Sequence, residues 1–368
     1  MADIYARLYA NPSSVHAAGL AARAVVEDAR VQVLSLLGVK RTEQCALIFC
    51  GSGTEANNTA IFGCAKAKRW RSTPAIITTD SEHPSISQPL ARLGGEGFVI
   101  VRLSTKDGML DMHELEETLS AHENVVLATF MLVNNETGAL YDVAQAFKLV
   151  KHLRPDALTH CDAVQGLGKL MFSPKSLNAD MLTVSAHKLG GPKGIGALYI
   201  DKPVLTAKKF VSYILGGGQE GGLRSGTENV AAIAGFGAAA EYHIKSGTRE
   251  NFRAETDKLR KFLEEHLPES VICNTPRGEY MPHIASVTLP GVKSEVMLRF
   301  LSERGIYVSS GSACSSRHRG ISQALLAFGL GEAAADSTIR VSFSGSTTEA
   351  DMLALACALR EGVNRLKR

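Results

Sequence analysis

The sequence predicts an α/β protein with a mostly parallel main sheet covered by helices on both faces. Short apolar runs alternate with helical stretches from residue 46 to residue 200, which is the pattern of such a sheet. The chain has 368 residues, of which 45% are hydrophobic and 21% charged, so its composition is globular and excludes a disordered chain. At ~150 residues per domain, this length indicates about two domains.

The apolar runs and their spacing predict the individual elements in order. A first helix is expected over residues 17–37, where alanine, valine and leucine recur at helical spacing. Further helices are expected to start near Thr54, Ser85, Asp111, Asp142 and Gln165. The strands of the main sheet are expected at residues 46–49, 75–79, 98–101, 125–133, 157–160, 181–184 and 195–200.

The C-terminal third predicts a smaller α+β domain. A long helical region begins near Asn229 and is interrupted at Ser246 and Gly247. After it, strands are expected near 284–289 and 339–343, with helices over 294–304 and 349–366. We therefore expect a large domain over residues 11–246 and a small domain over 247–368, preceded by a short segment of residues 1–10.

Composition also excludes several classes of partner and compartment. The net charge is only +3, which gives no strong attraction to nucleic acid or to an anionic membrane. No apolar run reaches the ~20 residues of a membrane helix, and residues 1–10 lack an apolar signal core. Seven cysteines occur without a CxxC pair, and no HxxxH pair is present, so a metal site is not expected. These features favour a reducing, cytoplasmic compartment.

Polar residues directly follow five of the expected strands. Ligands in open α/β sheets bind beyond the carboxyl ends of the strands, so these residues form one candidate site if the strands are parallel. A loop cap or turn residue is the structural alternative for each of them taken alone. The groups are Gly51–Thr54, Glu82 with His83, Asn134 with Asn135, Asp162 with Gln165, and Ser185 with His187 and Lys188.

Two of these groups suggest specific chemistry. The glycine-rich turn at residues 51–54 opens a helix, where backbone N–H groups attract a phosphate; a plain turn with Thr54 as N-cap is equally compatible. Lys188 lies in a glycine-rich bend, where desolvation would favour a neutral amine able to form a Schiff base. Its structural alternative is a solvated surface lysine. Asp162 is an acidic group of the kind that a pyridinium nitrogen requires.

The order of motifs resembles that of cysteine desulfurases of the NifS/IscS type, within the class V aminotransferase group of fold-type I pyridoxal phosphate enzymes. The resemblance covers nearly the whole chain. It implies a three-layer α/β/α large domain and a smaller α+β domain. The motifs are NPSSVH at 11–16, GSGTEANN at 51–58, SEHPS at 81–85, VNNETG at 133–138, CDAVQ at 161–165, SAHKLGGPKG at 185–194, GGGQEGGLRSGTEN at 216–229, SSGSAC at 309–314 and STIRVS at 337–342.

This resemblance implies a role for each residue around the cofactor ring. Lys188 would hold pyridoxal 5'-phosphate covalently and later move the substrate Cα proton. Asp162 would pair with the pyridine nitrogen, because a protonated ring is the better electron sink. His83 would stack on the ring and take part in proton transfer, and Gln165 and Asn135 would bind near its hydroxyl.

The resemblance also assigns the phosphate site. Gly53, Thr54, Ser185 and His187 would bind the phosphate within one chain. Thr227 would reach the phosphate of a neighbouring subunit. The enzyme would therefore be a homodimer.

The resemblance assigns two further residues, one to substrate binding and one to sulfur transfer. Arg340 and Asn135 would bind the substrate, with the guanidinium of Arg340 holding the carboxylate. Cys314 lies in a loop of small residues, and by resemblance its thiolate would take the sulfur of L-cysteine as a persulfide and release alanine. The sulfur would then pass to an acceptor or iron–sulfur scaffold protein.

Departures from the family pattern leave alternatives open. Only ten residues precede Asn11, where relatives usually carry a strand, so substrate affinity is expected to be weaker. The basic run at residues 317–320 suggests a different acceptor. A selenocysteine lyase or another class V lyase or transaminase is one alternative. A catalytically impaired paralogue that acts as a dimeric sulfur-relay partner is another.

Overall fold

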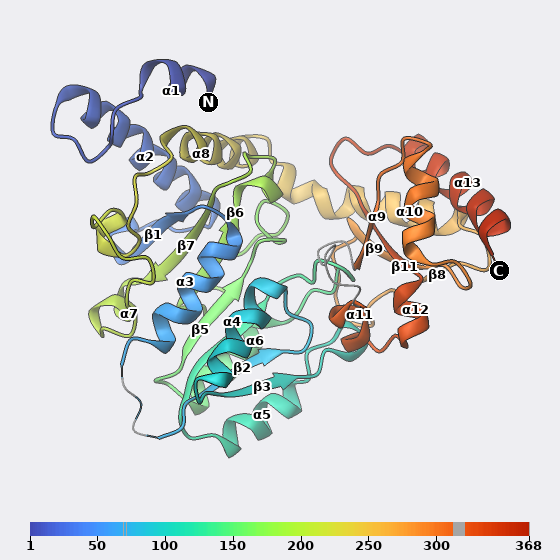
Figure 1. The fold of residues 1–368 in the computed structure, drawn as a ribbon, viewed down its shortest axis with the longest axis horizontal. Coiled ribbons are helices and arrows are strands. Elements are labelled where there is room, and N and C mark those ends of the chain that lie inside the picture. Colours follow the sequence, from blue (N-terminus) through green and yellow to red (C-terminus); the bar gives the residue numbers. More distant parts are fainter. Residues whose placement is uncertain (69, 71, 312–320, 368) are drawn as a thin grey trace.

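The computed structural model describes residues 1–68, 70, 72–311 and 321–367, and within them it contains two sheets. The larger sheet has seven strands in the order β1-β7-β6-β5-β4-β2-β3. Its strands lie within one or two residues of the predicted ones, as Figure 1 shows. They are β1 (Cys45–Cys50), β2 (Ala75–Thr79), β3 (Val99–Leu103), β4 (Val125–Met131), β5 (Leu158–Asp162), β6 (Met181–Ser185) and β7 (Gly196–Asp201).

The direction of the strands confirms the mostly parallel sheet. β6, β5, β4, β2 and β3 pair in parallel, whereas β7 runs antiparallel to both of its neighbours, β6 and β1. β1 therefore runs in the same direction as β6. As a result, the five strands that the sequence marks with polar residues all end at one edge of the sheet.

Helices cover both faces of the larger sheet and make a three-layer structure. Neighbouring residues of a strand point to opposite faces, so Ile76 and Ile77 belong to two different apolar clusters. One cluster includes α2 (Ala17–Leu36), α6 (Val143–Leu153) and α8 (Val230–Lys245), and the other includes α3 (Gly53–Ala65) and α4 (Pro84–Gly95). The remaining helices beside this sheet are α1 (Ala2–Arg7), α5 (Met112–Ala121) and α7 (Lys202–Thr206).

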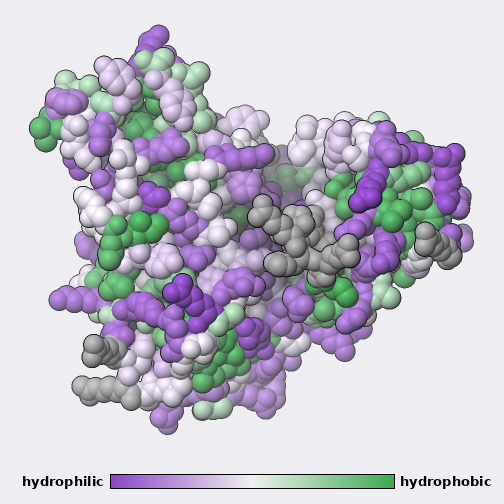
Figure 2. All heavy atoms as spheres, in the orientation of Figure 1, coloured by the Kyte–Doolittle hydropathy of each residue, from purple (hydrophilic) through white to green (hydrophobic). Residues whose placement is uncertain are grey.

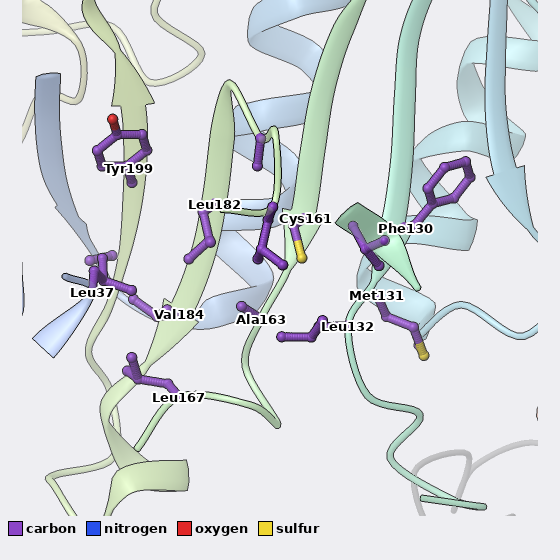
Figure 3. Packing of buried hydrophobic residues seen from close by; sticks show 14 of the residues in the cluster. Leu37, Phe130, Met131, Leu132, Cys161, Ala163, Leu167, Leu182, Val184 and Tyr199 are labelled. Carbon is purple, nitrogen blue, oxygen red and sulfur yellow. The ribbon is translucent and has the colours of Figure 1, made fainter. Parts of the chain in front are cut away.

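The core of the larger sheet is continuous across its central strands. Figure 3 shows Phe130, Cys161, Leu182 and Val184 side by side on one face, with Tyr199 beside them on β7. Phe130 also stacks on Phe147 of α6, with ring centroids 5.3 Å apart. This packing fixes the ends of β4, β5 and β6, from which several site residues project.

The expected helix near Gln165 is wrong. Residues 164–169 form successive turns, in which the amides of Gly166 and Leu167 both donate to the carbonyl of Ala163. Gly168 has a φ of +74°, in the left-handed region that interrupts a helix and that glycine tolerates. Two glycines within four residues therefore replace the helix with a compact loop that carries Gln165.

The second sheet has four antiparallel strands in the order β10-β11-β9-β8. It is built from residues after α8, and α9 (Thr248–His266) leads to it from the larger sheet (Figure 1). Its strands are β8 (Ile272–Cys273), β9 (Ile284–Thr288), β10 (Ser309–Ser310) and β11 (Thr338–Ser342). Its other helices are α10 (Ser294–Ser302), α11 (Gln323–Ala327), α12 (Glu332–Asp336) and α13 (Glu349–Leu366).

None of the described helices combines the length and the apolar character needed to cross a bilayer. Figure 2 shows hydrophobic residues as separate patches between hydrophilic ones on the face in view.

Candidate active site

A cavity of about 280 Å³ lies beyond the carboxyl ends of the parallel strands and gathers most of the predicted site residues. A larger hollow of about 360 Å³ lies near Met109 and Leu140, but its lining is mainly apolar and contains no cluster of catalytic groups. The predicted residues that line the smaller cavity are Gly53, Thr54, His83, Asn135, Asp162, Gln165, Ser185, His187, Lys188 and Arg340.

Among the described residues of the prediction, one does not line the cavity. Thr227 is exposed in the loop before α8 and is not in the lining. Cys314 lies outside the described residues.

The start of α3 makes one wall of the cavity and offers backbone amides to an anion. Ser52, not Thr54, is the N-cap, and its hydroxyl accepts a hydrogen bond from the amide of Glu55 at 3.1 Å. The first amides of a helix have no intrahelical acceptor and carry partial positive charge, so this turn suits a phosphate. Gly53 lies here against Ser185, where an added Cβ would come within 3.3 Å of the serine Cβ. The close approach brings Ser185 and the amides of this turn to the same wall.

A salt bridge connects this turn to the loop that carries Thr227. The guanidinium of Arg224 donates to both carboxylate oxygens of Glu55, at 2.7 and 3.2 Å. Glu55 also accepts from the amide of Gly51 at 2.8 Å. Because Arg224 lies three residues before Thr227, this bidentate contact holds the two segments together.

Asp162 ends β5 and supplies a buried carboxylate at the floor of the cavity. Its Oδ1 accepts from the amide of Val164 at 3.0 Å, and its Oδ2 accepts from the side-chain amide of Asn57 at 2.7 Å. Asp162 is only 7% exposed, so these two hydrogen bonds satisfy part of a buried charge. A protonated ring nitrogen is a suitable further donor to such a group.

His83 caps the N-terminus of α4 and lines the cavity from the side of β2. Its Nδ1 accepts from the amide of Ser85 at 3.1 Å and lies 2.7 Å from the Ser85 hydroxyl. Burial lowers the pKa of His83, the positive charge of Lys188 lowers it further, and the carboxylate of Asp162 opposes the shift. His83 is therefore expected to be neutral at neutral pH.

Lys188 follows β6 on the short 3₁₀ helix η3 (Ala186–Leu189), which ends at Gly190 in the left-handed region. The ammonium of a second lysine, Lys169, donates to the backbone carbonyls of Gln165 at 3.3 Å and Lys188 at 3.1 Å. Burial, with a smaller effect of Lys188, lowers the pKa of Lys169 to about 8. Lys169 thus joins the two loops, whereas Lys188 lines the cavity.

His187 and Ser185 continue the anion site next to Lys188. The Ser185 hydroxyl lies 2.9 Å from Nδ1 of His187. Desolvation lowers the pKa of His187, and Lys188, Lys193 and Lys169 lower it further. A cluster of three lysines beside a helix N-terminus gives this end of the cavity a positive potential suited to a phosphate.

Among the described residues, Arg340 is the one member of the lining that comes from the second sheet. Its Nη1 donates to the backbone carbonyl of Asn135 at 2.9 Å and leaves other guanidinium donors available to a carboxylate. The next residue, Glu136, accepts from the hydroxyl of Ser322 at 2.6 Å, and burial raises its pKa. The loop at residues 133–138 therefore contacts both Arg340 and the start of α11.

Burial makes several of the other described cysteines poor nucleophiles, because it raises the pKa of their thiols. Burial raises the pKa of Cys50, Cys64 and Cys161 far above the ordinary value, and it raises the pKa of Cys45 to about 11. Among the described cysteines, Cys357 on α13 is exposed.

The lining residues fit the pyridoxal phosphate that the motifs imply. The amides at the start of α3 offer an anion site, and Asp162 offers a carboxylate for a protonated ring nitrogen. Lys188 offers an amine for an aldehyde, and His83 offers a flat ring. No group of described residues has the arrangement of a metal site.

Sequence reasoning missed six residues of the lining or left them without a role. Asn57 and Ser85 lie within the quoted motifs but had no assignment. The spacing of Gly53 and Asn57, four apart at the start of a helix, could have indicated that both face the cavity. The other four are Ser52, Met131, Val133 and Val164.

Comparison with known proteins shows the family of the chain. Residues 1–355 match the family described as aminotransferase class-V. The chain belongs to the class-V aminotransferase family. A cysteine desulfurase from a Nostoc species is 37% identical over 363 residues, which are 98% of this chain and 87% of the relative. The cysteine desulfurase NifS of Azotobacter vinelandii is 33% identical over 355 residues, covering 96% of this chain and 85% of that protein.

Solved structures of related proteins share the fold of this family member. A NifS-like protein superposes with a TM-score of 0.89 at 32% identity, covering 99% of this chain and 94% of that one. A NifS-like protein from Rickettsia africae gives 0.84 at 31% identity, covering 96% and 92%. SspA, solved in complex with cysteine, gives 0.76 at 30% identity, covering 92% of each chain. These likenesses confirm the fold-type I architecture.

Proposed function

We propose that this protein is a pyridoxal phosphate-dependent cysteine desulfurase that converts L-cysteine to L-alanine and retains the sulfur on Cys314. The observation that carries the proposal is the single cavity lined by Lys188, Asp162, His83 and Arg340. The relatives named cysteine desulfurase support it. They do not favour a selenocysteine lyase or an impaired paralogue.

The residues would hold the cofactor at four of its groups. Gly53, Thr54, Ser185 and His187 would bind its phosphate, and Lys188 would bind its aldehyde carbon. Asp162 would accept a hydrogen bond from its ring nitrogen, while Gln165 and Asn135 would lie near its hydroxyl. When bound, the cofactor supplies an electron sink that makes the substrate Cα–H acidic.

The chain's own residues would then carry out the reaction. Arg340 would bind the substrate carboxylate, and Nζ of Lys188 would take the Cα proton. The Cys314 thiolate would attack the substrate sulfur, so that an S–S bond forms and the Cβ–S bond breaks. The electron pair of the broken bond passes to Cβ, which is protonated to give alanine, and the sulfur remains as a persulfide.

The same proposal includes an assembly and a partner. Thr227, exposed in this chain, would reach the phosphate in the site of a second copy, which makes the enzyme a homodimer. The persulfide sulfur would pass to an acceptor or iron–sulfur scaffold protein.

Incubation of the cofactor-loaded protein with L-cysteine and a reductant tests the function. We expect equal amounts of alanine and sulfide, and a persulfide on Cys314 in peptide mass spectra. Cys314→Ser should keep the cofactor and lose the persulfide, whereas Cys357→Ser, at an exposed cysteine on α13, should keep both. Turnover that survives Cys314→Ser would favour the selenocysteine lyase reading, and absence of alanine would contradict the proposal.

A further inference from the structure

A chain of hydrogen bonds runs from Asp162 to His83 behind the cavity wall. The side-chain nitrogen of Asn57 lies 2.7 Å from Asp162 Oδ2 and 2.8 Å from the hydroxyl of Ser85. That hydroxyl lies 2.7 Å from Nδ1 of His83. Asn57 and Ser85 are 1% and 5% exposed, so bulk water does not compete for these contacts.

The polarity of this chain is fixed by its two ends. An ionised carboxylate only accepts hydrogen bonds, so Asn57 must present its NH₂ group to Asp162, and its second N–H then goes to Ser85. The Ser85 hydroxyl accepts that bond and has one proton left, which it donates to His83 Nδ1. The Ser85 backbone amide also donates to Nδ1 at 3.1 Å. Two donors therefore converge on this ring nitrogen.

The orientation of Asn57 has a cost that supports this reading. Its Oδ1 is buried and has no hydrogen-bond partner among the described residues. A flipped amide would instead aim Oδ1 at the carboxylate of Asp162, which is repulsive. The Asn57 side chain therefore leaves its buried Oδ1 without a hydrogen bond, so that its amide nitrogen can donate both hydrogen bonds.

We propose that Asn57 and Ser85 are positioning residues that hold His83 as a neutral imidazole with its proton on Nε2. A carboxylate in direct contact with a histidine Nδ1–H leaves Nε2 free as a base. Here the inserted amide and hydroxyl reverse that polarity, so that Nδ1 accepts and Nε2 donates. His83 therefore offers the cavity an N–H donor. The consequence for catalysis rests on the proposed function: the basic nitrogen that takes the Cα proton is that of Lys188.

The electrostatics of the site agree with a neutral His83. Burial is the largest cause of its lowered pKa. The charged groups that act on it are Asp162 on β5, which raises the pKa, and Lys188 on η3, which lowers it. Hydrogen bonds from Ser85 to Nδ1 stabilise the neutral ring further, because that nitrogen must lose them to take a proton.

Variants of Ser85 and Asn57 test the proposal through the titration of His83. Hydrogen–deuterium exchange at the imidazole C2 position, followed across pH by peptide mass spectrometry, reports the pKa of His83 in the full chain. Ser85→Ala removes the hydroxyl donor, and Asn57→Ala frees that hydroxyl to accept from Nδ1–H. Both should raise the pKa of His83. Ser85→Thr keeps a hydroxyl, so it should behave as the wild type.

Ser87→Ala is the matched control, because Ser87 lies on the same helix and forms no side-chain hydrogen bond within the described part of the chain. It should leave His83 unchanged. In cofactor-loaded protein, Ser85→Ala should lower kcat about three- to tenfold, the factor expected for one lost hydrogen bond, with KM unchanged.

A pKa of His83 that stays at the wild-type value in both Ser85→Ala and Asn57→Ala would overturn the proposal. The exchange measurement is made before and after addition of pyridoxal phosphate, and it needs no substrate. A failure of the cysteine reaction would therefore leave this result intact, and the two proposals can fail separately.

Discussion

The two sheets differ in what their buried polar side chains contact. In the second sheet, Asn274 donates to the hydroxyls of Ser286 at 3.1 Å and Thr288 at 2.8 Å, and Thr288 bonds Thr338 at 2.7 Å. All four are buried, and they satisfy one another. At the edge of the larger sheet, polar side chains such as Asp162 and Lys188 surround a cavity instead.

This difference separates a structural polar cluster from a binding site. A buried polar group costs free energy unless it has a partner, and the second sheet provides partners within itself. The edge of the larger sheet leaves hydrogen-bonding capacity directed at a space that a ligand can fill. Variants in the first set should therefore change stability, and variants in the second set should change chemistry.

The largest expected effect is that of Lys188→Ala. Loss of the amine should remove the covalent attachment of pyridoxal phosphate and lower turnover by at least ~10³-fold, since both attachment and proton transfer are lost. Absorption spectra of the cofactor-loaded variant and an alanine assay measure the two effects. Lys175→Ala, at an exposed lysine that does not line the cavity, is the control and should match the wild type.

Arg340→Lys should have the next largest effect. Lysine keeps the positive charge but cannot make the paired contacts of a guanidinium, so a loss of ~2 kcal/mol in binding the substrate carboxylate corresponds to about a 30-fold loss of kcat/KM. Steady-state kinetics with L-cysteine give this value. Unchanged kcat/KM, with the cofactor fully bound, would remove Arg340 from substrate binding.

Asn274→Ala should break the polar cluster of the second sheet without touching the site. The hydroxyls of Ser286 and Thr288 lose a buried donor, so the free energy of unfolding should fall by about 2 kcal/mol. Urea unfolding measures the loss, and cofactor absorption below the transition should stay as in the wild type. Loss of cofactor binding in the folded variant would contradict the view that this polar cluster affects stability alone.

Glu82→Gln should have the smallest effect on turnover, and its effect on stability should depend on pH. Glu82 is buried beside the site, where it accepts from Thr79 and from the amide of Met131, and burial raises its pKa from 4.5 to about 8. The folded state therefore keeps a proton that the unfolded chain loses above pH 4.5. The stability linked to this group is complete below pH 4.5 and is lost as pH rises through about 8.

Glutamine cannot ionise, so Glu82→Gln should lack this decline, and its free energy of unfolding at pH 9, relative to that at pH 5, should exceed that of the wild type. Urea unfolding at both pH values is the measurement. Glu116→Gln, at an exposed glutamate of α5, is the control. Parallel pH curves for Glu82→Gln and the wild type would show that Glu82 is ionised in the folded protein.

The sequence was sufficient to predict the larger sheet and the edge at which the candidate site residues lie, because both follow from local patterns. Buried parallel strands are short apolar runs, and the polar residue after each run marks the strand end. Local patterns also caused the errors. The helix expected near Gln165 is broken by Gly166 and Gly168, and the cap of α3 is Ser52, two residues before Thr54.

Contacts between distant segments could not be predicted in this way. Asn57 meets Asp162 across 105 residues, and Arg340 meets Asn135 across 205 residues. Such pairs depend on which strands become neighbours and on how the second sheet sits against the first. For this reason the sequence indicated Asp162 and His83 separately, and only the structure shows the chain of hydrogen bonds between them.

The most direct test of the account is the identity of the lysine that holds the cofactor. The structure offers two candidates close together, because Lys169 is partly buried with a pKa lowered to about 8, while Lys188 lines the cavity. Borohydride reduction of the protein loaded with pyridoxal phosphate, followed by peptide mapping, fixes the label on the lysine that was bound. The account predicts the label on Lys188; a label on Lys169 would contradict it.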